Sequence, residues 1–327
     1  MGPVAGAVHL MDPIMPMGPA PGPAWVDVFT TWEPAWGIDA VLAVLGALYL
    51  TGALRHGSWP VRRTASFLAA LAAAVLTWNS GIAVFGHGAF AVHMVMHLML
   101  IMVVPAFWVA GHPLELLRHQ LHGGAARAFD AAVAGRVARA VTFPATVLVV
   151  YAVVIVLTHL TGFMEAMAGS MALHHGEQVL YLAVGLLFFH TAIGVDVLPH
   201  RPAYFARFVL MLIAMGVDTL TGIVLMLAPA TMFPSYDAEG VHLGGAIMWV
   251  GGDGLMMVIM VLLGRLWVSD PSGRVDFGPW LESARRSAFS EQTGDAGAPD
   301  HVGDLDDDDD ALAAYNRMLA RLDRGEH

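Results

Sequence analysis

The sequence predicts an all-α integral membrane protein: a bundle of about seven transmembrane helices, with its N-terminus outside and its C-terminus in the cytoplasm. Three observations lead to this fold class: the composition, the lengths of the apolar segments and the distribution of Arg along the chain. Apolar residues make up 57% of the sequence, charged residues only 13%, and the mean hydropathy is +0.63. A soluble domain typically carries about 25% charged residues, so much of this apolar surface must face lipid.

Apolar segments of the required length recur along the chain. A bilayer core about 30 Å thick is crossed by roughly 20 helical residues. The segments that qualify are 36–54, 64–84, 88–110, 141–161, 173–194, 205–229 and 244–267. We therefore predict a transmembrane helix in each of them.

The basic residues, all of them Arg, indicate the orientation of these helices. They follow the first and third segments, lie beside the start of the sixth and follow the seventh (Arg55, Arg62, Arg63; Arg118, Arg127, Arg136, Arg139; Arg201, Arg207; Arg265 onward). The connections on the other side, 85–87, 162–172 and 230–243, contain no Arg, and neither does 1–35. Because positive charge is enriched in cytoplasmic loops, the Arg-bearing side is predicted to be cytoplasmic. An even number of spans would break this alternation.

Three regions are predicted on this basis. Residues 1–35 form a Met/Pro-rich outer N-terminal segment, and residues 36–268 form the seven-helix transmembrane domain. Residues 269–327 form an acidic cytoplasmic tail containing the run Asp306–Asp310. Its composition predicts a solvated, largely disordered segment that ends in a short helix.

Histidine is the residue type that points to chemistry. The sequence holds 16 His and no Cys, which excludes disulfides and thiolate metal sites. With the predicted topology, a group of them gathers in the outer half of the membrane or at its outer surface (His87, His93, His97, His159, His174, His175, His242). Ionisable side chains at membrane depth are costly and mark candidate functional sites.

The pair His93 and His97 is the sharpest motif. Residues at i and i+4 lie on one helix face about 6 Å apart, so two imidazoles can converge on one ion. Imidazole suits copper, zinc and iron, and the thioether of the interleaved Met94 would favour Cu(I). A single buried His is more often structural, but this spacing favours a metal site. The predicted ligand set is His93, His97, His174, His175 and Met94, with Cu(I) as the metal.

Two acidic residues, Asp218 and Asp253, are predicted near the midplane of the membrane. Three uses remain open for them: an acceptor that fixes the tautomer of a ligating imidazole, a proton relay, or a hydrogen bond between helices. Asn79, Ser80 and Glu177 are further polar groups of the outer half with the same open uses.

Three stretches of the sequence resemble a known family. The pattern of the third segment (His93-Met94, His97, Leu100, Met102, Pro105, Gly111, Pro113) resembles the signature of the multi-spanning CtaG family of bacterial cytochrome c oxidase assembly factors. Two later stretches resemble the same family (His174-His175, Glu177, Gly185, Phe188-Phe189; Gly244-Gly245, Met248-Trp249, Gly251). The resemblance runs over about residues 36–268. It implies a multi-pass protein of the bacterial plasma membrane that assists maturation of a haem–copper oxidase.

The leading hypothesis is therefore a non-enzymatic metallochaperone that collects copper at the outer face and passes it to oxidase subunits in the same membrane. One alternative is a b-type, haem-binding electron carrier with two axial His. Another is a copper permease, whose path would include Asp218 and Asp253. An enzyme is least supported, because the sequence has no nucleotide-binding loop or nucleophile motif. Neither a nucleic-acid partner nor a small-molecule substrate is indicated.

Overall fold

The computed structural model describes residues 23–194, 198–200, 202–269 and 324. Most of the predicted outer N-terminal segment and nearly all of the predicted acidic tail lie outside the described residues. The chain divides into two units, Met1–Met260 and Val261–His327, and the sites discussed below all belong to the first. The described residues are helical throughout their ordered elements, with one isolated β-bridge between Trp32 and Ser80. The all-α fold class is confirmed.

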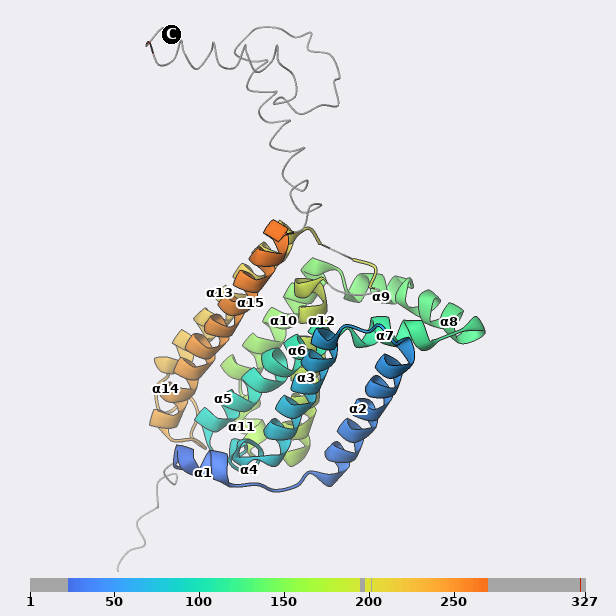
Figure 1. Ribbon diagram of the computed structural model, residues 1–327. Coiled ribbons are helices and arrows are strands. Elements are labelled where there is room, and N and C mark those ends of the chain that lie inside the picture. Colours follow the sequence, from blue (N-terminus) through green and yellow to red (C-terminus); the bar gives the residue numbers. More distant parts are fainter. Residues whose placement is uncertain (1–22, 195–197, 201, 270–323, 325–327) are drawn as a thin grey trace, which may run out of the picture. The chain divides into compact units, whose positions relative to one another are not determined.

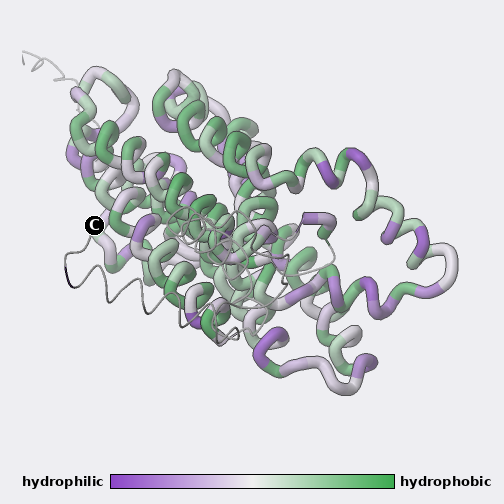
Figure 2. Tube along the Cα trace, turned by 90° about the horizontal axis from the view of Figure 1, so that it is seen from above, coloured by the Kyte–Doolittle hydropathy of each residue, from purple (hydrophilic) through white to green (hydrophobic). Residues whose placement is uncertain are grey.

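Five helices are long and apolar enough to cross a membrane, and they coincide with five of the predicted segments. They are α2 (Trp36–His56); α5, η1 and α6 in continuous succession (Phe90–Leu98, Met99–Val103, Val104–Ala110); α12 (Met171–Ile193); α13 (Tyr204–Met226); and α14, η2 and α15 in continuous succession (Ala238–Ala246, Ile247–Gly251, Gly252–Ser269). The remaining two predicted segments correspond to α3 (Val61–Asn79) and α10 (Pro144–Leu160). Figure 1 shows these helices, and Figure 2 shows that most of their length is apolar.

The second predicted segment, 64–84, is interrupted in the structure. α3 ends at Asn79, Ser80 is extended, and a separate short helix, α4 (Gly81–Gly86), follows. The Ser80 hydroxyl accepts a hydrogen bond from the backbone N–H of Ile82 at 3.2 Å. This is the contact of an N-capping Ser, which starts a new helix. Because the residues after Ser80 are apolar, the hydropathy of this segment does not reveal the break between α3 and α4.

Five short helices were not predicted as separate elements, besides α4. They are α1 (Trp25–Thr30), α7 (Pro113–Gln120), α8 (Gly123–Val133), α9 (Arg136–Val141) and α11 (Phe163–Ala168). The helices α7, α8 and α9 form the Arg-bearing connection between α6 and α10. The helix α1 packs against α4, with Val28 only 1% exposed.

The helix pair α5–α6 lies at the centre of the packing. It contacts α3, α12 and α14. In its most apolar stretch 67% of the residues are buried, whereas the corresponding share for α2 is 22%. Gly185 of α12 allows a close approach to the π-helical turn η1, since a Cβ there would clash with the carbonyl oxygen of Ile101. The central position of α5 and the closeness of α12 set the geometry of the candidate site.

Candidate metal centre

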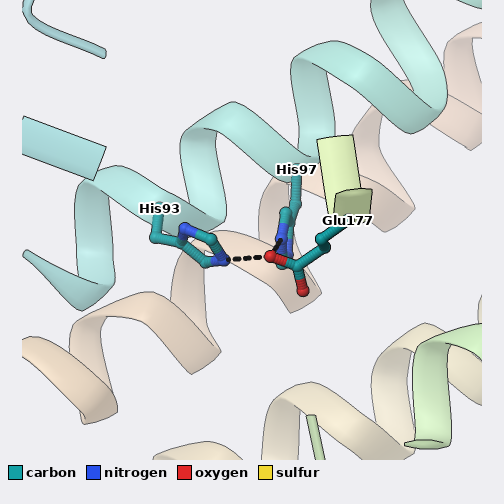
Figure 3. Close-up of side chains that lie close together, drawn as sticks. All are labelled: His93, His97 and Glu177. Atoms are coloured by element: carbon teal, nitrogen blue, oxygen red, sulfur yellow. Dashed lines mark ion pairs between the residues drawn. The ribbon is translucent and has the colours of Figure 1, made fainter. Parts of the chain in front are cut away.

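Two helices bring three metal-ligating side chains together inside the bundle. His93 and His97 project from α5, and Glu177 projects from α12 (Figure 3). The Glu177 Oε2 atom lies 3.2 Å from His93 Nε2 and 3.4 Å from His97 Nε2. The three residues are 0%, 4% and 2% exposed in the order His93, His97, Glu177. One potential ligand atom from each lies within 4.8 Å of the others.

The sequence of α12 explains why Glu177 faces α5. His174, Glu177 and Tyr181 are spaced at i, i+3 and i+7, so they share one helix face, and each is buried. Ser170 caps the start of the helix by accepting a hydrogen bond from the backbone N–H of Leu173. The buried polar face of α12 is directed to the bundle interior rather than to lipid.

A chain of hydrogen bonds fixes the tautomers of the imidazoles. The carbonyl oxygens of Gly86 and Ile155 can only accept, so the Nδ1–H of His93 donates to Gly86 at 3.0 Å and the Nδ1–H of His159 donates to Ile155 at 2.9 Å. His159 Nε2 is then an acceptor, and it receives the Nδ1–H of His97 at 3.1 Å. In these neutral tautomers the Nε2 atoms of His93 and His97 both carry a lone pair, and both are directed at Glu177.

This arrangement is poorly satisfied without a cation. The contacts of His93 and His97 with Glu177 are short but lack hydrogen-bond geometry, and within the described residues both Nε2 atoms and both Glu177 oxygens are buried with no hydrogen-bond partner. Buried lone pairs that face one another are unfavourable. A metal ion with bonds of about 2.0–2.1 Å in tetrahedral geometry holds its ligand atoms roughly 3.3 Å apart, which fits the distances of 3.2 Å and 3.4 Å from Glu177 Oε2 to the two Nε2 atoms.

An aromatic ring and a hydroxyl group pack beside the site and help to orient His97. The ring of Tyr181 stacks on that of His97, with centroids 4.0 Å apart and an angle of 24° between the planes. The Tyr181 hydroxyl is hydrogen-bonded to Thr158 Oγ1 at 2.7 Å. Groups that orient a ligating imidazole in this way are the usual surroundings of a protein metal site.

The other predicted ligands lie in different places. His174 is adjacent to the site, with its ring centroid 5.4 Å from that of His93 and its Nδ1 atom 3.3 Å from Met167 Sδ. His175 lines an apolar groove between α2 and α12 instead. Met94 lines a small cavity that His97 borders as well.

The sequence alone does not indicate the roles of Glu177 and His159. In the sequence, Glu177 is only one of several polar groups of the outer half, and His159 is one of the clustered His. The i,i+3 spacing of Glu177 from His174 was the available signal for the first. No sequence signal places His159 next to His97, because the two are 62 positions apart and belong to different helices.

The two predicted midplane acids make hydrogen bonds between helices. The Tyr151 hydroxyl of α10 donates to Asp218 Oδ2 of α13 at 2.8 Å. The Thr219 hydroxyl of α13 donates to Asp253 Oδ2 of α15 at 2.6 Å. Of the three uses left open by the sequence, these contacts correspond to the interhelical one.

A second His–Glu pair lies near the Arg-bearing ends of the helices. His112 Nδ1 donates to Glu115 Oε2 at 2.8 Å, and Arg63 Nη1 donates to Glu115 Oε1 at 2.9 Å. Burial opposes ionisation of Glu115, but the hydrogen bonds from Arg63 and His112 outweigh it and hold the pKa of this carboxyl below its usual value. Close by, the Trp59 indole donates to the Tyr49 hydroxyl, which donates to the carbonyl oxygen of Gly111.

Comparisons with known proteins identify relatives of this chain. It is 28% identical over 333 residues to an uncharacterised protein of Mycobacterium leprae. It is 30% identical over 324 residues to uncharacterised proteins of Mycobacterium bovis and Mycobacterium tuberculosis. Each alignment covers 92% of this chain and 46% of the relative, so the chain spans about half the length of these curated relatives. No solved structure matches it.

A family match agrees with the resemblance found in the sequence. The sequence model described as cytochrome c oxidase caa3 assembly factor (Caa3_CtaG) matches residues 47–270. That range covers more than half of the chain and includes His93, His97 and Glu177. The chain therefore belongs to the family of cytochrome c oxidase caa3 assembly factors.

Proposed function

We propose that this protein assists the copper step of cytochrome c oxidase assembly by holding Cu(I) between His93, His97 and Glu177. The observation that carries the proposal is the convergence of two imidazole lone pairs and one carboxylate on a single buried point. Imidazole nitrogen is a good ligand for copper, and the clients of the family are oxidases. One carboxylate balances the single charge of Cu(I), so the loaded site is neutral at membrane depth, where net charge is costly. Copper is here a cargo that passes to an oxidase subunit in the same membrane.

We further propose seven transmembrane helices with an outer N-terminus and a cytoplasmic C-terminus, in a bacterial plasma membrane. The two helices beyond the five long ones, α3 and α10, pack along α6 and along α12 and α13 respectively. Their 19 and 17 residues correspond to about 25–28 Å of helix, close to the roughly 30 Å of a bilayer core.

Contacts between connecting segments that are predicted to lie on the same side of the membrane support this topology. At the Arg-bearing end, the ion pair of Arg63 with Glu115 joins the start of α3 to α7. At the opposite end, Ser235 Oγ donates to Glu165 Oε2 at 2.6 Å, joining the connections before α12 and before α14. No Arg occurs in these two connections, as expected for the outer side of a membrane.

A series of imidazoles supports loading from the outer side. His87, which follows α4, is partly exposed. Its ring centroid lies 5.1 Å from that of His174, which lies 5.4 Å from that of His93. The centroids of His93 and His97 are 4.1 Å apart. Successive ligands at such spacing let a metal ion move inward by exchange of one ligand at a time.

The metal site is tested by anaerobic Cu(I) titration of the purified full chain against a competing chelator. We expect Glu177→Gln to lose one equivalent of copper relative to the native protein, whereas Glu115→Gln, the matched variant of the second His–Glu pair, keeps it. Equal copper in all three proteins would overturn the proposed site. A Soret band that is present in the native protein and lost in His93→Ala/His97→Ala would replace copper handling by the b-type cytochrome alternative.

The topology is tested with single cysteines, because the chain has none of its own. Thr231→Cys lies before α14, and Ala134→Cys lies between α8 and α9; both native residues are exposed. In intact cells, a membrane-impermeant maleimide should label the first variant and not the second. The reverse labelling pattern would contradict the proposed orientation.

A further inference from the structure

A small cavity borders the candidate metal centre on α5 and contains a different set of donors. Its volume is about 10 Å³, which is room for about one water-sized occupant. The polar and sulfur-bearing side chains that line it include His97, His159, Asp218, Met94, Met102 and Met248. Glu177 is not among the lining residues, so the cavity is distinct from the His93–His97–Glu177 centre although His97 belongs to both.

The carboxylate in this cavity lacks a full set of partners. Asp218 is 1% exposed, and its Oδ2 atom accepts the Tyr151 hydroxyl at 2.8 Å. Its Oδ1 atom is buried and has no hydrogen-bond partner among the described residues. A buried carboxylate with an unpartnered oxygen is costly in an apolar bundle, and a bound cation is one way to satisfy it.

Three methionines from three different segments meet at the same cavity. Met94 belongs to α5, Met102 to η1 and Met248 to η2, and they are 1%, 1% and 5% exposed. Methionine in a buried position is usually packing. Here, however, the methyl end of Met102 and the Asp218 oxygen that is bonded to Tyr151 both lie near Gly252: a Cβ there would lie 3.4 Å from Met102 Cε and 3.8 Å from Asp218 Oδ2.

Local helix geometry distinguishes this region from the rest of the bundle. Met102 and Met248 lie in the two π-helical turns of the described chain, Met99–Val103 and Ile247–Gly251. A π-helical turn is rare, changes the direction of the side chains that follow it, and is frequently found at functional sites. That both turns contribute a thioether to one cavity is an independent indication that the cavity binds a ligand.

We propose that this cavity is a second, inner Cu(I)-binding position, formed by the thioethers of Met94, Met102 and Met248 with the carboxylate of Asp218. Thioethers select Cu(I), and a cavity for one occupant excludes the hydration shell that Mg²⁺ retains. Asp218 balances the single positive charge. His97 lies between the two positions and passes the ion from one to the other without a change of oxidation state. This inference rests on the proposed copper-handling function.

The test uses the purified full chain loaded anaerobically with Cu(I), with copper counted and its ligands identified by X-ray absorption. The native protein should bind two equivalents. Glu177→Gln should keep one, with sulfur ligands, and the double variant Met102→Leu/Met248→Leu should keep one with nitrogen and oxygen ligands only. Leu preserves the side-chain volume, and Asp218→Asn provides a second variant that should also lose the sulfur-ligated ion. Met257→Leu, which is exposed on α15, serves as the matched control and should bind two.

The outcomes separate this inference from the function on which it rests. One equivalent in the native protein, lost in Glu177→Gln and showing no sulfur ligands, would overturn the inner position and leave the proposed function intact. Sulfur-ligated copper that persists in Met102→Leu/Met248→Leu would overturn the assignment of its ligands. A native protein that retains no copper would overturn both proposals.

Discussion

Two of the His–Glu pairs in the described part of the chain lie at similar distances, and their surroundings differ. His93 and Glu177 are 3.2 Å apart with both side chains fully buried, whereas His112 and Glu115 are 2.8 Å apart with 15% and 29% of their side chains exposed. In the second pair every close contact joins a donor to an acceptor. In the first pair the facing atoms are acceptors, because the hydrogen on each imidazole is used elsewhere.

The comparison shows that distance alone does not identify a functional pair. The carboxylate of Glu115 receives hydrogen bonds from Arg63 and His112 and remains accessible to water, so it can stabilise the fold without any added ion. The carboxylate of Glu177 faces two imidazole lone pairs and is buried away from solvent. Such an unsatisfied arrangement is retained at a cost to stability, as expected of a binding site.

Removal of both imidazoles of the first pair should abolish tight copper binding at the His93–His97–Glu177 centre. We expect His93→Ala/His97→Ala to weaken Cu(I) affinity by more than about 100-fold, because two ligands are lost and even outer partners of a ligand contribute about 10–100-fold. His112→Ala should leave the affinity unchanged. Competition titration with a Cu(I) chelator measures both. Equal affinity of the double variant and the native protein would remove the distinction between the two pairs.

The residue that fixes the tautomer of His97 should have an intermediate effect. His159→Ala removes the acceptor of the His97 Nδ1–H, and we expect affinity for Cu(I) to fall about 10–100-fold. His242→Ala is the matched control, since His242 contacts the carbonyl oxygen of Ala228 away from the site. The same titration applies. A loss no larger than that of the control would show that His97 is oriented without His159.

The contacts of Glu115 should affect the stability of the fold rather than the affinity for copper. Arg63→Gln removes the ion pair with Glu115 and the contact of the guanidinium with the Trp59 ring, whose centroid is 4.7 Å away. Because these groups are partly exposed, the free energy of unfolding should fall by only about 1 kcal/mol. Thermal unfolding in detergent measures this change, and copper affinity measured in parallel should be native. Weakened copper binding would contradict the separation of the two pairs.

The loss of stability at acidic pH should depend in part on Glu115. Its pKa is held below the usual value in the folded protein, so its contribution is complete above the unfolded-state pKa of about 4.3 and is lost as pH falls through the lower folded-state pKa. We therefore expect Glu115→Gln to reduce the fall in Tm on acidification below that pH. Melting curves between neutral and acidic pH provide the comparison. Identical acid dependence in the two proteins would mean that Glu115 does not contribute to it.

The smallest effect is expected for an exposed ion pair. Arg118 makes two hydrogen bonds to Asp130, from Nε at 2.6 Å and from Nη2 at 2.9 Å. Exposed pairs contribute little because water and salt screen them, so Arg118→Ala should change neither Tm nor copper affinity measurably. A clear loss of Tm would mean that α7 and α8 are held together mainly by this pair.

Much of the fold could be predicted because membrane helices are encoded by length and apolarity. Each predicted segment coincides with a helix to within a few residues, except where Ser80 interrupts 64–84 and where Asp237 starts α14 ahead of 244. Both exceptions arise from a single capping side chain: Ser80 lies within an otherwise apolar stretch, and Asp237 starts α14 among polar residues that precede the apolar segment. Hydropathy averages over such residues, so it cannot locate them.

The candidate site could be predicted only in part. The spacing of His93 and His97 is local information, and it correctly places both imidazoles on one face of α5. The partnership with Glu177 depends on the rotation of α12 and on its close packing at Gly185, and the partnership with His159 depends on the placement of α10. These are tertiary features, and no spacing in the sequence reports them.

Delivery of copper from the buried His–Glu centre to an oxidase is measured most directly in cells. A bacterial strain that lacks the protein would be complemented with the native chain, Glu177→Gln or Glu115→Gln, at matched levels in the membrane. We expect the native chain and Glu115→Gln to restore the copper content and activity of the cytochrome c oxidase, whereas Glu177→Gln does not. Full restoration of both by Glu177→Gln would contradict copper delivery by this centre.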